Sequence, residues 1–101
     1  MDRLPERRSA IRIPIPIGCE LDLLLPGEPI PIASVCVELG VGGMTIHSHY
    51  VPRMDEEFEL MLRPPSHGGF APMHARVQVK RCHPLDGDVF EIGVQILEVL
   101  A

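Results

Sequence analysis

Three arginines lie close together near the start of the chain, in the stretch ERRSAIR at residues 6–12. Arg7, Arg8 and Arg12 form the pattern R-R-x-x-x-R, and Arg3 lies just upstream. A guanidinium is a planar fork of donors that binds phosphate oxygens or the O6 and N7 acceptors of guanine. The segment through Arg12 carries four arginines against two acids, and the remaining chain carries five bases against twelve acids. Such a basic segment on an acidic body is typical of a solvated tail or of an arm that captures an anion.

A second candidate binding element is the glycine-rich stretch VELGVGGMTI at residues 37–46. Gly40, Gly42 and Gly43 predict a tight turn between two strands, with positive φ angles and space for a ligand to approach the backbone. Glu38 adds a carboxylate, which can accept hydrogen bonds from N–H donors. Taken alone, this stretch is better explained as a glycine-rich hairpin, and the arginine segment as a solubilising tail.

The elements that must position these residues follow from an apolar period of two, which predicts strands. Four segments alternate in this way, at residues 19–26, 58–63, 74–81 and 89–96. Two shorter segments, at residues 31–38 and 43–48, fill the gap and bring the candidate strands to six. Clusters of Pro, Gly and Asp predict turns between several of them, namely PGEP at 26–29, PPSHGG at 64–69 and PLDGD at 84–88. Six strands joined in this way predict an antiparallel barrel or sandwich.

Three local signals refine this prediction. The alternation of the last segment slips after Ile96, which predicts a bulge or a strand end there. Asp86-Gly87 predicts a hairpin between the last two strands. The prolines within residues 11–17 predict an extended or edge segment that leads into the first strand.

Length and composition bound the class of protein. With 101 residues the chain is long enough for one domain. Three widely spaced cysteines indicate reduced thiols of a cytoplasmic protein rather than a disulfide framework. The sequence has neither a signal-peptide pattern nor an apolar run of membrane-spanning length, so we expect no membrane insertion. The acidic body disfavours a nucleic-acid polymer as partner and leaves a small anionic ligand open.

The arginine motif and the strand layout together resemble the PilZ domain, the bacterial receptor module for cyclic di-GMP. Arg7, Arg8 and Arg12 match the first motif of that family in full. The segment IGVQI around Gly93 is also similar to the closing strand of the family. The resemblance covers nearly the whole chain.

The second PilZ motif, D/N-x-S-x-x-G, is met only in part. Glu38 stands where the family has Asp or Asn, and Gly40 stands where it has Ser. Gly43 matches the final glycine. Glu38 still offers a carboxylate one methylene further out, whereas Gly40 offers no hydroxyl. A lost neutral hydrogen bond is worth roughly 0.5 to 1.5 kcal/mol, so the resemblance implies weakened binding at least as readily as abolished binding.

The resemblance implies both a fold and a ligand site. The implied fold is a small six-stranded antiparallel β-barrel over residues 13–101. A C-terminal helix is common in the family, but the sequence ends at Ala101 directly after the last candidate strand, so we expect little or no C-terminal helix. The short, charged and proline-bounded segment over residues 1–12 predicts a flexible basic leader. Without that helix, an apolar patch near Leu97, Val99 and Leu100 would remain for a partner or for a second copy in a homo-oligomer. The implied ligand-binding residues are Arg7, Arg8, Arg12, Glu38, Gly40 and Gly43.

The implied function is that of a cytoplasmic regulatory or adaptor domain that binds cyclic di-GMP and acts on a protein target. No cofactor is expected, and the sequence has none of the GxSxG, Walker-type or HExxH motifs that would indicate an enzyme. Two alternatives remain open. One is a PilZ-like interaction module that no longer binds the nucleotide. The other is a small metal-binding β-protein, whose candidate ligands are His47 and His49, with Cys36, His74, Cys82 and His83 as further donors.

Overall fold

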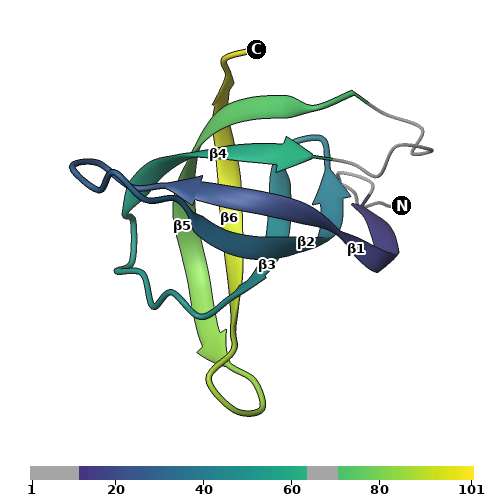
Figure 1. The fold of residues 1–101 in the computed structure, drawn as a ribbon. Helices are drawn as coiled ribbons and strands as arrows, with labels where there is room; N and C mark the ends of the chain where they lie inside the picture. The colour runs from purple at the N-terminus through teal and green to yellow at the C-terminus, as the bar shows by residue number, and fades with distance from the viewer. Residues whose placement is uncertain (1–11, 64–70) are drawn as a thin grey trace, which may run out of the picture.

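The computed structural model describes residues 12–63 and 71–101 and folds them into six strands that pair antiparallel. The strands are β1 (Arg12–Leu24), β2 (Ile32–Gly40), β3 (Gly43–Ser48), β4 (Glu57–Arg63), β5 (Met73–Pro84) and β6 (Phe90–Val99). They close into a barrel in the order β1-β2-β3-β6-β5-β4 (Figure 1). The predicted six-stranded antiparallel barrel is therefore confirmed, and the described ranges contain no helix. It follows that they contain no helix long and apolar enough to cross a membrane.

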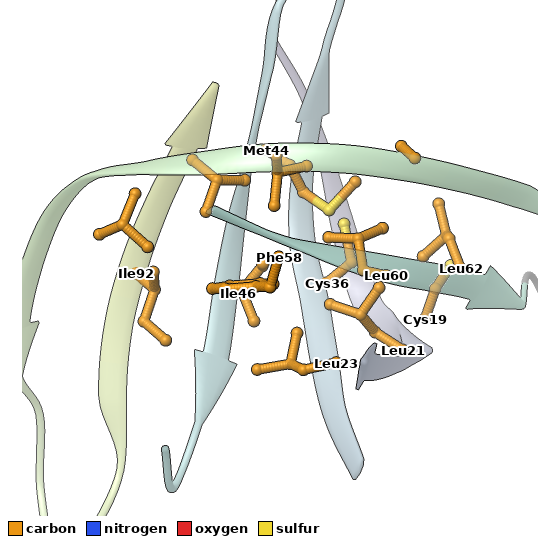
Figure 2. Close-up of a cluster of buried hydrophobic side chains, with 14 residues drawn as sticks. Cys19, Leu21, Leu23, Cys36, Met44, Ile46, Phe58, Leu60, Leu62 and Ile92 are labelled. Atoms are coloured by element: carbon orange, nitrogen blue, oxygen red, sulfur yellow. The ribbon is translucent and has the colours of Figure 1, made fainter. Parts of the chain in front are cut away.

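The barrel interior is filled by the apolar residues that the period of two places on one side of each strand. Figure 2 shows these side chains converging from the strands around them. They are Cys19, Leu21, Leu23, Cys36, Met44, Ile46, Phe58, Leu60, Leu62, Ala75, Val77, Val79, Ile92 and Val94. Truncating one of the larger members to alanine costs about 2 to 5 kcal/mol in a core of this kind. The interior is thus fully used for stability, and any ligand site must lie on the outer surface or at the barrel ends.

Two of the predicted turns are confirmed. In the β1–β2 turn the amide of Glu28 donates to the carbonyl of Leu25 at 3.1 Å, and Gly27 has a φ of 80°. Pro26 precedes that glycine, which is the arrangement of a type II turn. In the β5–β6 hairpin the glycine of Asp86-Gly87 has a φ of 67°. The third predicted cluster, at residues 64–69, lies outside the described residues.

The bulge predicted near the end of the last strand is also present. Val77 of β5 pairs with Ile96, but Arg76 pairs with Glu98, which leaves Leu97 as an extra residue in β6. The strand continues beyond this bulge because the alternation resumes with a new register.

The first strand differs from its prediction, because β1 begins at Arg12 rather than at Cys19. The proline-containing segment therefore forms part of the barrel wall. Its pairing with β2 is interrupted between Pro14 and Cys19. Gly18 lies in this bulge with a φ of 83°, and a Cβ there would lie 2.5 Å from Cγ1 of Val35. Only glycine meets both demands, so Gly18 is what permits the strand to bend here.

Candidate functional site

The bulge in β1 brings the end of the arginine motif beside the glycine turn. Arg12 is the Cα partner of Gly40. If the register that pairs Cys19 with Cys36 continued without a break, Ile15 would stand opposite Gly40 instead. The register shift therefore aligns two motifs that lie far apart in the sequence.

The other arginines of the motif, Arg7 and Arg8, lie outside the described residues, as does most of the predicted flexible leader over residues 1–12. Arg12 is the one member of the motif that the structure places, at the first position of β1. The start of the barrel wall thus lies one residue inside the predicted leader.

The turn of the second motif joins β2 to β3 through Val41 and Gly42. The amide of Ile96 donates to the carbonyl of Gly42 at 2.9 Å and fixes the turn against β6. The prediction of positive φ angles in this turn is wrong. Within the described ranges, glycines with positive φ are Gly18, Gly27 and Gly87. Gly40 is held in a strand pairing with β1, so its backbone conformation is open to other residues.

Beside this turn, a row of residues crosses four strands on the side of the barrel wall that faces away from the core, and Thr45 within this row is buried. Glu38 pairs with Thr45, Thr45 with Gly93, and Gly93 with Arg81. We call this row, together with the turn at residues 40–43, the motif face. Thr45 Oγ1 donates to Glu38 Oε1 at 3.2 Å, and Arg81 Nη2 donates to Thr45 Oγ1 at 3.4 Å. The structure therefore links the carboxylate of the incomplete motif to a guanidinium, through a hydroxyl that the sequence analysis did not single out.

A second row lies next to the first and centres on Glu91. His47 Nε2 lies 3.1 Å from one oxygen of this carboxylate, and His83 Nε2 lies 3.3 Å from the other. Arg81 Nη1 is 3.7 Å from the same second oxygen. Glu91 is thus the shared partner of three potentially cationic side chains, and it holds them against β6.

Of the donors named for a metal site, His47 and His83 share the carboxylate of Glu91, but His49 and Cys36 lie apart from them. His49 bonds through Nδ1 to the backbone carbonyl of Asp88 at 3.2 Å, away from the shared carboxylate. Cys36 is buried in the core, where desolvation raises the pKa of its thiol to about 11. Such a thiol stays protonated at neutral pH and is a poor metal ligand. Across residues 12–63 and 71–101, no group of three or more His, Cys, Asp or Glu side chains is arranged to hold a metal ion.

A groove of about 730 Å³ lies between the β1–β2 turn and the loop before β4, at the other end of the β1–β2 pair from the motif face. We call it the loop groove, and it is lined by Leu25, Pro26, Glu28, Ile30, Ile32, Tyr50, Arg53, Met54, Asp55, Glu56 and Glu57. Its lining has four carboxylates against one guanidinium. Ile30 and Met54 are 76% and 59% exposed at its rim.

The loop groove is organised by one carboxylate. Tyr50 donates its hydroxyl to Glu56 Oε2 at 2.6 Å, and the amide of Arg53 donates to Glu56 Oε1 at 2.9 Å. Desolvation and the bond to Glu56 raise the pKa of Tyr50 to about 12. The amide of Val79 also donates to the backbone carbonyl of Glu56 at 2.9 Å. Glu56 therefore ties the loop to β5.

The apolar patch predicted at the end of the chain is exposed. Leu97, Val99 and Leu100 are 38%, 60% and 39% exposed. The segment is nevertheless anchored, because the amide of Leu100 donates to the carbonyl of His74 at 2.7 Å.

Solved structures of low sequence identity share this architecture. The chain superposes on the Bacillus subtilis inhibitor of motility, MotI (DgrA), with a TM-score of 0.76 and 16% identity. It superposes on the PilZ domain of Escherichia coli YcgR bound to cyclic di-GMP with a TM-score of 0.69 and 16% identity. This chain has a PilZ-like fold. A third match is YcgR in complex with cyclic di-GMP, with a TM-score of 0.74 and 16% identity.

These matches cover nearly all of this chain but a smaller share of the matched chains. The alignments cover 96%, 91% and 91% of this chain, but 46% of MotI, 79% of the YcgR PilZ domain and 38% of the longer YcgR chain. The chain thus spans less than half of MotI. No protein-family model and no curated protein sequence matches it. At such low identity the likeness establishes the fold alone.

Proposed function

We propose that this chain is a cyclic di-GMP-binding regulatory or adaptor domain of bacterial second-messenger signalling, acting in the cytoplasm on a protein target. The observation that carries the proposal is the pairing of Arg12 with Gly40, which aligns the arginine motif with the turn of the second motif. The PilZ-like fold supports it, because the similar structures include a PilZ domain with cyclic di-GMP bound. The proposed domain comprises a flexible basic leader over residues 1–12 and the barrel over residues 13–101.

The proposed site residues are Arg7, Arg8, Arg12, Glu38, Gly40 and Gly43. In this site the arginines bind the phosphates and the guanine edges of the ligand, because a guanidinium fork matches both. Glu38 accepts hydrogen bonds from guanine N–H groups, while Gly40 and Gly43 leave the backbone of the turn accessible. The site works by binding alone, without catalysis or a cofactor.

The test is calorimetric titration of cyclic di-GMP into the purified protein at one fixed salt concentration. Saturable binding is expected, and GMP at the same concentration should give at most weak binding because it offers one base and one phosphate. No heat with cyclic di-GMP up to millimolar concentration would refute the proposal.

A second candidate function is a PilZ-like interaction module that has lost the nucleotide. Gly40 favours this candidate, because glycine cannot provide the hydroxyl that the family motif has at this position. The module would act through exposed apolar surface, such as the patch at Leu97, Val99 and Leu100. Absence of nucleotide binding, with a concentration-dependent change of molecular mass in sedimentation experiments, would favour this candidate in the form of a homo-oligomer.

A further inference from the structure

The side chain of Arg81 packs against the backbone of Gly93, in space that a larger residue at position 93 would occupy. Arg81 is the Cα partner of Gly93, and a Cβ on Gly93 would lie 2.7 Å from both Cγ and Nε of Arg81 and 2.8 Å from its Cζ. The guanidinium therefore lies directly on the backbone of β6. Any larger residue at position 93 would have to push it away.

A bulge in β5 turns Arg81 toward the motif face. Val79 points into the core, so in a regular strand Arg81 would point inward as well. The register of β5 against β6 shifts between Val79 and Arg81, and this shift sets Arg81 opposite Gly93 on the outer surface. The strand thus departs from regular pairing at the residue that presents a cation beside the incomplete motif.

The surroundings of Arg81 leave it donors for a ligand. Its bond to Thr45 measures 3.4 Å and its distance to Glu91 is 3.7 Å, so both contacts are long. The oxygen of Glu91 that it approaches is also shared with His83. The side chain of Arg81 is 47% exposed. A guanidinium has five N–H donors, and these contacts engage only a minority of them.

We propose that Arg81 is a ligand-binding residue of the motif face, where its guanidinium bonds an anionic phosphodiester oxygen of the nucleotide. This inference rests on the proposed function and names a residue outside both sequence motifs. The contact compensates for the hydroxyl that is missing at Gly40, because a charge-assisted bond is stronger than a neutral one. Thr45 orients both Arg81 and Glu38 through its hydroxyl.

The experiment compares Arg81→Gln with Arg76→Gln by calorimetry with cyclic di-GMP at one salt concentration. Arg76 is a matched control, because it lies on the same strand, is 44% exposed and pairs with Glu98 at 2.9 Å, away from the motif face. Arg81→Gln should weaken binding by about tenfold or more, and Arg76→Gln should leave it unchanged. Arg81→Lys should fall between the parent and Arg81→Gln, because it keeps the charge and loses the fork.

A second variant tests the packing of Arg81 on Gly93 without removing the arginine. Gly93→Ala displaces the guanidinium, so it should weaken binding although Arg81 is still present, with thermal unfolding used to verify that the variant is folded. If the parent binds cyclic di-GMP and Arg81→Gln binds equally well, the role of Arg81 is refuted and the proposed function stands. If the parent does not bind, both are refuted together.

Discussion

The motif face and the loop groove lie at opposite ends of the β1–β2 pair, and each is built around a glutamate that accepts a hydroxyl. At the motif face Thr45 donates to Glu38, and in the loop groove Tyr50 donates to Glu56. The surrounding charges differ. Arg81 reaches Thr45 on one side, whereas four carboxylates against one guanidinium surround Glu56 on the other. The same kind of hydroxyl–carboxylate bond therefore occurs at the motif face, which is a candidate anion-binding site, and in the loop groove, whose acidic lining repels anions.

The largest effect is expected from the arginines that precede the motif face. Arg8→Ala and Arg12→Ala should each weaken cyclic di-GMP binding by about 10- to 150-fold, because loss of a charge-assisted bond costs roughly 1.5 to 3 kcal/mol. Arg3→Ala should have a smaller effect, since Arg3 lies outside the matching motif. Calorimetry at two salt concentrations is the measurement. Equal losses at all three positions that vanish at high salt would indicate unspecific attraction instead.

Next in size is the effect of removing the carboxylate that organises the loop groove. Glu56→Ala should lower the free energy of unfolding by about 1 to 3 kcal/mol, because the Tyr50 hydroxyl and the Arg53 amide lose their acceptor. Glu57→Ala is the control, since no ion pair or hydrogen bond involves its side chain in the described structure. Both variants should bind cyclic di-GMP like the parent. If Glu56→Ala is folded but no longer binds cyclic di-GMP, the loop groove rather than the motif face is the nucleotide site.

A smaller gain is expected from restoring the second motif. Gly40→Ser should tighten cyclic di-GMP binding by up to about tenfold, because it adds the missing hydroxyl and Gly40 carries no positive φ that would strain serine. Glu38→Asp brings the carboxylate to the family length but moves it away from Thr45 Oγ1, so the two changes should not be additive.

The measurement is calorimetry of the two single variants and the double variant, with thermal unfolding of each. A folded double variant that binds no better than the parent would show that this turn is not a degenerate nucleotide site. It would thereby favour the interaction module.

The smallest effect concerns alkaline pH, where each region holds one group that resists ionisation. Cys36 donates to the carbonyl of Glu38 beneath the motif face, and burial raises its thiol pKa from 9.0 to about 11. Above pH 9 the unfolded chain loses this proton while the folded chain keeps it, so stability falls as the pH rises toward 11. The fall should be roughly 1 kcal/mol between pH 8 and 10.

Denaturant unfolding at pH 8, 9 and 10 measures this fall. Cys36→Val should reduce it, whereas Tyr50→Phe should change it less, because Tyr50 has an ordinary pKa of 10.0 and contributes mainly above that value. An unchanged slope in Cys36→Val would contradict the assignment.

Sequence patterns were sufficient for the strands and insufficient for the registers. The period of two identified β1, β4, β5 and β6, because inward positions had to be apolar to fill the barrel, and the two shorter segments between them were predicted as β2 and β3. The alternation through Val79 would turn Arg81 inward, and only the β5–β6 pairing reveals that a bulge turns it outward. The prolines before Cys19 similarly concealed that β1 begins at Arg12, since its bulge depends on the space between Gly18 and its neighbour on β2. The bulge at Leu97 could be predicted because the alternation of its own segment slips there. The bulges in β1 and β5 could not, because they depend on the pairing with a neighbouring strand.

Closure of the barrel also bears on how quickly the chain can fold. β1 pairs with β4, and β3 pairs with β6, so neither contact is made by strands that are neighbours in the sequence. The entropy lost in closing such long loops is compensated only after most of the wall has formed. We therefore expect refolding on the millisecond-to-second timescale typical of β-barrels rich in non-local pairing, which is slow for a chain of this length.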